Sequence, residues 1–440
     1  MNTPSANVAQ PAVQRSAADP IASTRKRAVL AASIGNILEW YDFVLYAYFS
    51  TYIAQKFFPT GNEATSFLIT IATFGVGFVA RPVGAVVLGS FADRAGRKAA
   101  LMVVIALMAL GTGLIGLTPS YDDIGLWAPA TIVVARLMQG FSSGGEWGGA
   151  TSFVVEHAPE HRRGFYGSWQ QFSLAVALLL GSLTGSVLSY ALEPAALADW
   201  GWRIPFVAGA LLMGPFGLWL RLGIDEAHAT GSAQPVAATP IREALGRHRR
   251  SMVAGVAFTV GWTVTNYLYL VYMSVYLTRT LQIEKVDALL ATSIQIAAFM
   301  ALSPLMGLLS DRIGRRRVMV AGASCVAAGT YPVFAYMAAH PAFATLVPAL
   351  VLLGLFMAMM TGPAPAWQAE LYPRRIRTSA ISMSYNLAVT VFGGFAPFVA
   401  TWLITVTGSV LSLTFYISAC AAVSLVTVLV CRETAHRPLP

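Results

Sequence analysis

Five ionisable side chains interrupt otherwise apolar stretches of this sequence, and their chemistry gives the first indication of function. Glu39 and Asp42 lie in the first stretch, Arg81 in the second, and Arg136 with Glu146 in the fourth. A charged side chain inside a membrane span is costly, so such residues are functional candidates by default. Carboxylates can take up and release a proton, and guanidinium groups can bind an anion through two parallel hydrogen bonds. We therefore interpret the three carboxylates as candidate proton-coupling residues and the two arginines as candidate anion-binding residues.

The first apolar stretch places its polar groups on one face of a helix. Asn36, Glu39 and Asp42 are spaced by three residues, and Tyr46 follows four positions after Asp42. This spacing aligns them along one side of a helix. A face with two carboxylates is unsuited to lipid, so we expect it to line a cavity or to meet a cation, with Arg136 as the expected counter-ion. The alternative is a permanent buried ion pair, which stabilises a fold poorly because both charges lose water.

Arg81 and Glu146 each allow two interpretations. Arg81 precedes a proline, which loosens the hydrogen bonding of its helix, and it either binds an anionic substrate or pairs with Glu39, Asp42 or Glu146. Glu146 follows a glycine-rich run and either carries a proton or is held by hydrogen bonds in a packing seam. All six histidines lie in loops or tails, so a proton carrier inside the membrane has to be a carboxylate.

Further substrate-binding candidates are uncharged side chains in the apolar stretches. Their amide, indole and phenol groups can hydrogen-bond a polar substrate, although aromatic residues in spans more often serve packing or anchoring at the membrane interface. Together with Asn36 and Tyr46, the candidates are Gln139, Trp169, Gln170, Asn266, Tyr269 and Asn386.

The composition requires that these stretches lie in a membrane. Hydrophobic residues make up 56% of the 440 residues and charged residues 11%, against about 25% charged residues in soluble domains. A spanning helix needs about 20 mostly apolar residues. Twelve stretches meet this length, at 30–54, 65–91, 99–118, 127–153, 166–190, 202–222, 251–277, 287–309, 317–338, 343–369, 379–406 and 409–431. They predict an all-α membrane protein with twelve transmembrane helices.

Two repeats divide these helices into equal halves. The pattern Gly89–Lys98 recurs as Gly307–Arg316, 218 positions later, and an E-x-x-P-x-x-x-R pattern occurs at 156–163 and again at 370–377. We expect two pseudo-symmetric six-helix bundles whose loop residues form a conformational latch; the alternative is that these loops only anchor the chain at the membrane surface. The predicted latch residues are Gly89, Asp93, Arg94, Arg97, Glu156, Arg163, Gly307, Asp311, Arg312, Arg315, Glu370 and Arg377.

The charge distribution sets the expected domains and topology. With a cytoplasmic N-terminus, most of the 29 lysines and arginines fall on the cytoplasmic side, as the positive-inside rule demands. The net charge of +9 therefore indicates contact with membrane lipid rather than nucleic acid. The expected segments are a disordered N-terminus (1–24), a first bundle (25–222), a cytoplasmic linker (223–250), a second bundle (251–432) and a cytoplasmic tail (433–440).

Several other functions have no motif in this chain. A phosphate-binding G-x-x-x-x-G-K-[ST] sequence is absent, as are hydrolase signatures, and the three cysteines show no metal-ligand spacing. We therefore expect no enzyme activity, no metal and no cofactor. We also expect a monomer. A non-transporting membrane sensor remains an alternative, although it would need an added signalling domain.

Longer stretches resemble the major facilitator superfamily and, within it, the metabolite–proton symporter family. The resemblance covers residues 25–432 and rests on both loop patterns and on the stretches Gly35–Phe43, Arg81–Gly84, Gly145–Gly149 and Trp202–Phe206. Within that family the chain is similar to bacterial citrate and tricarballylate symporters, from which it departs at Trp40-Tyr41, at Glu146-Trp147 and in 265–269.

The resemblance implies a secondary transporter of the bacterial inner membrane with both termini in the cytoplasm. It would import a small organic anion together with a proton, by alternating access between the bundles. The similarity to citrate and tricarballylate symporters favours a tri- or dicarboxylate. The same family includes carriers of oxoglutarate, phthalate-like and shikimate-like acids and osmolytes, which stay open as alternatives. Proton-driven export of a cationic drug would suit an acidic cavity, but the two intramembrane arginines oppose it.

Overall fold

The computed structural model describes residues 20–95, 97–211 and 240–440, and in these ranges the chain is helical with no strand. Side chains are described there except at 20–32, 89–90, 92–95, 97–98, 100–101 and 240–241. The predicted disordered segment therefore lies outside the described residues up to residue 19, and the predicted linker up to residue 239. The backbone is already helical from Pro20 onward.

The first half consists of long helices broken by short turns. Its elements are α1 (Pro20–Tyr48), α2 (Ser50–Phe57), α3 (Glu63–Val79), α4 (Arg81–Ala95), α5 (Arg97–Leu117), α6 (Tyr121–Ile124), α7 (Trp127–Ser143), α8 (Glu146–His157), η1 (Glu160–Arg162), α9 (Arg163–Gly167), α10 (Trp169–Ala191), α11 (Pro194–Asp199) and η2 (Gly201–Arg203). A further helix occupies 204–211. The breaks after α3 and α7 fall next to Arg81 and Glu146, so two of the predicted functional residues begin a new helical segment.

The second half repeats this layout with three π-helical turns, η4, η5 and η6. Its elements are α13 (Pro240–Arg247), α14 (Arg249–Asn266), η4 (Tyr267–Val271), α15 (Met273–Val275), η5 (Tyr276–Thr280), α16 (Lys285–Ile313), α17 (Arg315–Ala339), α18 (Phe343–Thr361), α19 (Ala364–Glu370), α20 (Arg377–Ala388), η6 (Val389–Gly393), α21 (Ala396–Thr407) and α22 (Ser412–Val430). Turns of this wide type are rare and occur frequently at functional sites. Here η4 and η6 follow α14 and α20.

Seven helical segments of the described chain are long and apolar enough to cross a membrane. They are Glu63–Leu88, Glu160–Ala191, Lys285–Ile313, Arg315–Ala339, Phe343–Glu370, Arg377–Thr407 and Ser412–Val430. The described residues of the other predicted stretches are also largely helical, but none of them forms a segment of this kind, so the count of twelve spans stays a prediction. The chain is a multi-pass, all-α membrane protein.

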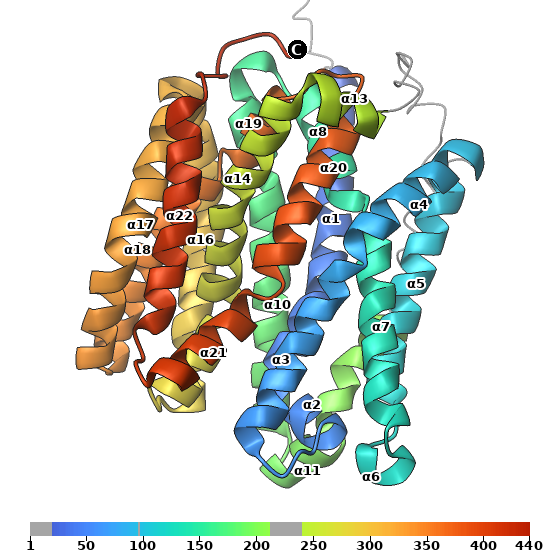
Figure 1. The fold of residues 1–440 in the computed structure, drawn as a ribbon, viewed down its shortest axis with the longest axis vertical. Coiled ribbons are helices and arrows are strands. Elements are labelled where there is room, and N and C mark those ends of the chain that lie inside the picture. Colours follow the sequence, from blue (N-terminus) through green and yellow to red (C-terminus); the bar gives the residue numbers. More distant parts are fainter. Residues whose placement is uncertain (1–19, 96, 212–239) are drawn as a thin grey trace, which may run out of the picture.

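Two groups of helices stand side by side along the long axis of the molecule. Figure 1 shows α3, α4, α5 and α7 on one side and α16, α17, α18 and α22 on the other, with α14 and α20 between them. The halves meet where α10 packs on α16, α8 on α20 and α21 on α3. The candidate functional residues lie along this junction and in the neighbouring interior of the first half.

Glycines bring α7 close to α3 and α4. A Cβ atom added at Gly140 would overlap the carbonyl oxygen of Gly77, and one added at Gly144 would overlap that of Arg81. Only a residue without a side chain permits this approach. The contact fixes α7, which carries Arg136, against the segment that carries Arg81.

Candidate functional site

Arg81 forms an ion pair with Glu39 deep between the helices. Its Nη2 atom lies 3.5 Å from Glu39 Oε1, and the two side chains are only 2% and 6% exposed. The guanidinium carbon also lies 4.6 Å and 4.5 Å from the ring centres of Phe43 and Phe78. Of the two interpretations of Arg81, pairing with a carboxylate describes this conformation. Its Nε and Nη2 donors make no hydrogen bond, so the guanidinium keeps donors suited to an anion.

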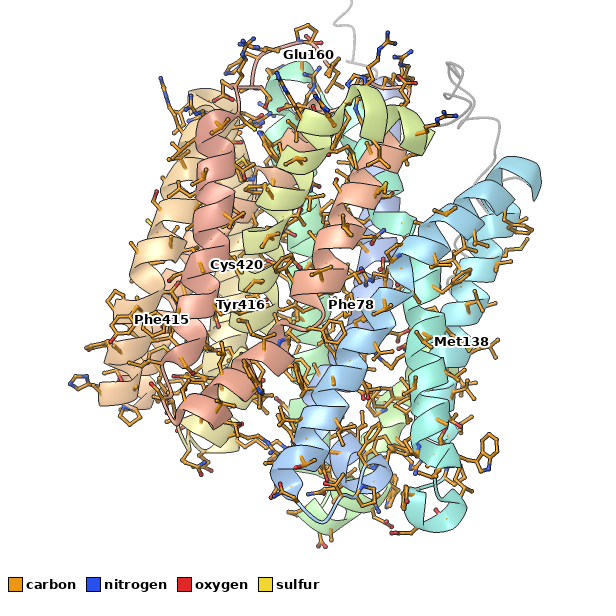
Figure 2. The ribbon with its side chains drawn as sticks, in the orientation of Figure 1. Phe78, Met138, Glu160, Phe415, Tyr416 and Cys420 are labelled. Atoms are coloured by element: carbon orange, nitrogen blue, oxygen red, sulfur yellow. The ribbon has the colours of Figure 1, made fainter. Side chains whose placement is uncertain are left out.

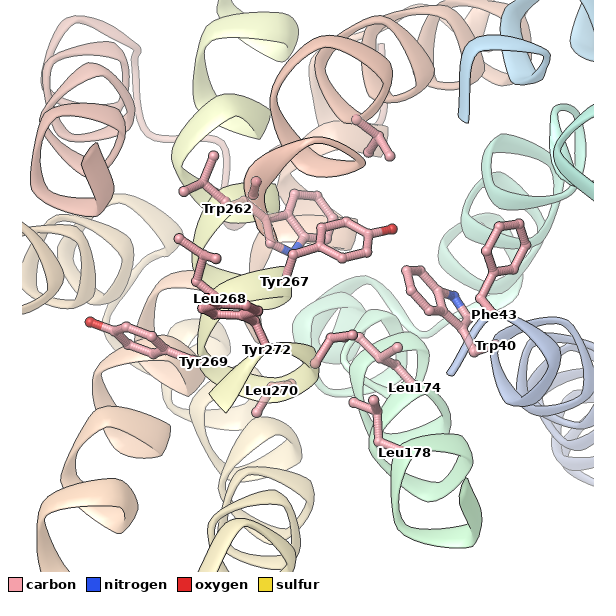
Figure 3. Packing of buried hydrophobic residues seen from close by; sticks show 14 of the residues in the cluster. Trp40, Phe43, Leu174, Leu178, Trp262, Tyr267, Leu268, Tyr269, Leu270 and Tyr272 are labelled. Carbon is pink, nitrogen blue, oxygen red and sulfur yellow. The ribbon is translucent and has the colours of Figure 1, made fainter. Parts of the chain in front are cut away.

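Aromatic residues of the second half face this ion pair. The Tyr267 ring lies 5.4 Å from Phe78 and 5.9 Å from Trp40, and Figure 3 shows it pointing toward Trp40. Phe78 itself lies near mid-height of the bundle (Figure 2). The ion pair is therefore sandwiched between the halves, where a change in their relative position would expose it.

Unused hydrogen-bond donors surround the same junction. Trp147 stacks on Tyr385 with ring centres 4.6 Å apart, and Trp262 packs against both rings at 5.6 Å. The indole N–H groups of Trp147 and Trp262 and the Tyr267 hydroxyl are buried without a hydrogen-bond partner. Buried polar groups normally have partners, so donors of this kind are suited to the oxygen atoms of a ligand.

Asp42 belongs to a second cluster, inside the first half. Thr112 Oγ1 donates a hydrogen bond of 2.6 Å to Asp42 Oδ2, and Gln139 Nε2 donates one of 2.8 Å to Thr112 Oγ1. Arg136 Nη1 in turn donates to Gln139 Oε1 at 2.9 Å. Thr112 and Gln139 thus stand between Arg136 and Asp42 in the hydrogen-bonded chain, while Arg136 still acts on the carboxylate electrostatically, as expected of a counter-ion.

Aromatic rings hold Arg136 away from the acid. Its guanidinium carbon lies 4.7 Å from the ring centres of Phe43 and Tyr46 and 5.0 Å from that of Phe74, and Nη2 donates to the Phe74 carbonyl oxygen at 3.2 Å. Cation–π contacts of this type stabilise a desolvated guanidinium by about 2 kcal/mol or more. Phe43 contacts both arginines and thus links the two clusters.

Two of the predicted substrate-binding residues on α1 are used inside the first half. Asn36 Nδ2 donates to Ser173 Oγ at 2.7 Å and to the Gln170 carbonyl oxygen at 3.2 Å, which ties α1 to α10. The Tyr46 hydroxyl donates to the Thr70 carbonyl oxygen at 3.2 Å. The side-chain Oε1 of Gln170, by contrast, is buried without a partner.

The remaining polar candidates separate into residues at the junction and residues away from it. Asn386 donates from Nδ2 to the Gly144 carbonyl oxygen of the first half, and Asn266 is buried with its Oδ1 unpartnered. Tyr269 instead hydrogen-bonds Thr330 within the second half and points away from Trp40 (Figure 3). Trp169 is half-buried and packs on Phe165 and Phe172, which lie four residues before it and three residues after it in the sequence.

Glu146 has a different environment from the other two carboxylates. It is the first residue of α8 and is only half-buried, whereas Glu39 and Asp42 are buried. The position at a helix N-terminus favours a negative charge.

One end of the bundle carries the loop motifs and joins the halves; we call it the loop-motif end and define it by Glu156, Asp311, Arg315, Glu370 and Arg377. Figure 2 shows Glu160 at this end, close to the C-terminal tail. The ion pair between Glu156 Oε1 and Arg377 Nη1, at 2.6 Å, crosses from α8 to α20. Arg315 Nη2 lies 3.3 Å from Glu370 Oε1 within the second half.

Asp311 bridges the halves through backbone groups. Its two carboxylate oxygens accept hydrogen bonds from the N–H groups of Gly164, at 2.9 Å, and Phe165, at 2.8 Å, at the start of α9. Arg315 Nη1 donates to the same carboxylate at 2.7 Å. Gly307 allows this approach, since a Cβ atom there would lie 2.5 Å from the Gly164 carbonyl oxygen.

The other predicted latch residues are placed less uniformly. Arg163 donates to the carbonyl oxygen of Arg437 in the tail at 2.8 Å and lies 3.2 Å from Glu160, while Arg312 is exposed. The side chains of the first motif copy fall outside the described part of the chain. That copy comprises Gly89, Asp93, Arg94 and Arg97.

Thr112, Phe43 and Phe78 were not among the predicted site residues. Thr112 completes the chain of hydrogen bonds to Asp42, and the two phenylalanines form the walls around Arg81. A threonine or phenylalanine in an apolar span gives no signal by itself. Only the spacing of Thr112 and Thr330, which are 218 positions apart like the two loop motifs, could have drawn attention to this pair.

Comparison with known proteins places this arrangement in a family. Residues 28–227 match the family described as Sugar (and other) transporter, and residues 255–439 match the Major Facilitator Superfamily. The chain is 38% identical to the citrate-proton symporter of Klebsiella pneumoniae, over 90% of this chain and 89% of that protein. It is 38% identical to the alpha-ketoglutarate permease of Escherichia coli K12, over 86% and 87% of the two chains. The proline/betaine transporter of the same strain is 34% identical over 94% and 85%.

Solved structures show the same fold at low identity. The partially occluded inward-open xylose transporter XylE of E. coli superposes with a TM-score of 0.74 at 18% identity, over 95% of this chain and 100% of that one. Together with the identity to the curated relatives, this confirms the family that the sequence motifs indicate. The chain belongs to the major facilitator superfamily, within which it groups with the metabolite–proton symporters.

Proposed function

We propose that this protein imports an organic acid together with protons across the bacterial inner membrane, with a tri- or dicarboxylate such as citrate or tricarballylate as the favoured substrate. The observation that carries the proposal is the buried Arg81–Glu39 ion pair at the junction of the halves. It is supported by relatives that are named citrate-proton symporters and an alpha-ketoglutarate permease.

The ion pair offers a direct way to couple an anion to a proton. A substrate carboxylate and Glu39 compete for the guanidinium of Arg81. Protonation of Glu39 removes its charge and leaves Arg81 to the substrate, so proton and anion bind together. An inside-negative potential opposes the entry of each negative charge by about 2.3 kcal/mol per 100 mV, which proton co-transport offsets.

Alternating access requires contacts between the halves to break in turn. At the loop-motif end the halves are joined by Glu156–Arg377 and by Asp311 with α9. At the opposite end they are joined by Arg279 and Glu63, with Nη2 and Oε1 3.2 Å apart. The excess of basic residues at the loop-motif end supports a cytoplasmic position for that end and for both termini.

A second candidate function is uptake of a zwitterionic osmolyte. The rings of Trp147, Trp262 and Tyr385 lie together at the junction, and aromatic faces bind quaternary ammonium groups. Arg81 would then hold the carboxylate of the same molecule. Relatives named proline/betaine transporters support this alternative.

Uptake assays on the purified full chain in liposomes test both candidates. With an alkaline interior, labelled citrate, tricarballylate, oxoglutarate, phthalate and glycine betaine are offered one at a time. We expect accumulation of a polycarboxylate that a protonophore abolishes. Accumulation of glycine betaine alone would favour the osmolyte function. If none of the acids accumulates, or if collapse of the pH gradient changes nothing, proton-coupled acid uptake is refuted.

A further inference from the structure

Thr112 on α5 lies between the cation Arg136 and the predicted proton carrier Asp42. The proposed function gives it no role. Its side chain is fully buried, and its hydroxyl both accepts from Gln139 and donates to Asp42. It contacts neither Arg81 nor the aromatic residues of the second half in any described interaction. Its described side-chain hydrogen bonds are these two, and they connect it to the predicted proton carrier and to the partner of Arg136.

The direction of the hydrogen-bond chain is fixed by chemistry. A guanidinium can only donate, so the atom of Gln139 that faces Arg136 must be the accepting oxygen. The amide nitrogen of Gln139 then faces Thr112 and donates to it. The single hydroxyl hydrogen of Thr112 is left for Asp42 Oδ2. Every donor points from the cation toward the acid, and bonds aligned in this way strengthen one another.

The far oxygen of Asp42 provides a place for the proton. Asp42 Oδ1 is buried without a hydrogen-bond partner, and it faces Gly209, where an added Cβ atom would lie 3.5 Å away. A proton can bind Oδ1 while Oδ2 still accepts from Thr112. The bond from Thr112 then ends on a neutral acid instead of a carboxylate, and it loses about half of its strength.

The surroundings of Asp42 contain few other titratable groups. Arg136 on α7 acts on it through space as well as through the hydrogen bonds. On α1, Tyr41 is its neighbour in sequence, and Glu39 and Tyr46 share its helix face. Thr112 on α5 is neutral, and helix 204–211 presents the side-chain-free Gly209. Within the described residues, Thr112 and Gln139 form the hydrogen-bonded route from Asp42 to Arg136, beside the direct electrostatic interaction of the two charges.

We propose that Thr112 is a positioning residue that couples the protonation of Asp42 to the placement of Arg136, an inference that rests on proton-coupled transport as the protein's function. When Asp42 is charged, the row of hydrogen bonds through Thr112 holds Gln139 in place, and Gln139 holds Arg136. When Asp42 is neutral, these hydrogen bonds weaken. Arg136 then shifts against Phe43, whose ring also contacts Arg81. Proton occupancy at Asp42 thereby reaches the anion-binding arginine without direct contact.

The second half supplies a matched control. Thr330 lies 218 positions after Thr112, and Met357 lies 218 positions after Gln139. Thr330 is equally buried but bonds the Tyr269 hydroxyl, which does not ionise near neutral pH. Replacing Thr330 by valine also removes a buried hydroxyl and its side-chain hydrogen bond, but the partner lost is a tyrosine hydroxyl rather than a carboxylate.

Infrared titration of the full-length protein in lipid tests the proposal without a substrate. The carboxylic acid band of Asp42 is identified by its loss in D42N, and its appearance is followed as the pH falls in wild type, T112V, T112S and T330V. Removal of the Thr112 donor disfavours the charged carboxylate, so we expect the band to appear at a higher pH in T112V. T112S and T330V should titrate like wild type. Wild-type titration in T112V, or an equal shift in T330V, would overturn the proposal.

Transport of labelled citrate gives a second measure. In T112V we expect accumulation driven by a pH gradient to fall about tenfold, while exchange of citrate without a gradient stays within about twofold of wild type. If T112V does not fold, Q139L breaks the chain one bond earlier and should shift the infrared band in the same direction. Wild type that fails to move citrate would count against the proposed substrate, while the infrared result would still decide the role of Thr112.

Discussion

The two halves of the molecule place a buried threonine at matching positions, but they give it different partners. In the first half Thr112 donates to the carboxylate of Asp42 and receives from Gln139, which binds Arg136. In the second half Thr330 bonds the Tyr269 hydroxyl. The helical framework is thus repeated, whereas among the described residues only the first copy of this threonine is linked to ionisable side chains by these hydrogen bonds. A transporter built in this way can keep proton chemistry in one half and use the other to close over it.

The junction shows the same division of labour. The first half supplies the ion pair of Arg81 and Glu39, and the second half supplies Tyr267, Trp262 and Tyr385 around it. The charged groups of the first half can change state with a proton or an anion. The aromatic groups of the second half can only pack or hydrogen-bond. From this difference we predict that variants in the first half alter the coupling of substrate transport to protons, while matched variants in the second half alter it little.

The largest effect is expected for Arg81→Ala. Its guanidinium is the anion-binding group at the junction, so we expect uptake of the acid to fall at least about 100-fold. The change also removes the guanidinium that pairs with the buried Glu39 carboxylate, and breaking a buried ion pair destabilises a protein by about 3–5 kcal/mol. The measurement is uptake by liposomes together with thermal unfolding in detergent. The double variant E39Q/R81A is the control: it should regain thermal stability without regaining uptake, and full uptake by either variant would remove Arg81 from the site.

The next effect compares Asp42→Asn with Tyr269→Phe. Asparagine cannot carry a proton, so D42N should lose accumulation against a gradient while still exchanging labelled acid across the membrane. Y269F removes only the hydroxyl from the non-titrating pair, and we expect its accumulation to stay within about twofold of wild type. Both are measured by uptake with and without a pH gradient. Equal losses in the two variants would contradict the assignment of proton chemistry to the first half.

These variants also show what the sequence could and could not predict. Glu39, Asp42, Arg81 and Arg136 stood out because charged groups in apolar stretches are costly, and the repeated loops predicted two halves. The hydrogen-bond partners of Arg136 could not be predicted, because they depend on the distance between α1 and α7 and on the rings around the guanidinium. Sequence spacing along one helix shows which residues share a face, but not which neighbouring helix that face meets. Thr112 was missed for the same reason.

A smaller effect is expected at the loop-motif end from Glu156→Gln. Arg377 is completely buried and lies 2.6 Å from Glu156, so loss of the carboxylate weakens a contact between the halves and favours opening at this end. We expect faster modification of a single cysteine placed at Gly167, which packs against Ala366 of the other half, by a membrane-permeant thiol reagent, with the three native cysteines replaced. A charge swap, E156R with R377E, should restore slower modification. Unchanged rates in E156Q would mean that the pair does not hold this end closed.

The smallest effect is expected at the opposite end from Glu63→Gln. The pair between Glu63 and Arg279 also joins the halves, but the two side chains are 73% and 29% exposed, and exposed pairs contribute at most about 1 kcal/mol. Salt screens such pairs further. We therefore expect the transport rate of E63Q at 150 mM salt to stay within about twofold of wild type, with any difference vanishing at 1 M salt. A loss as large as that of E156Q would show that the two ends are equally important, and that burial of the ion pair does not determine which contact controls opening.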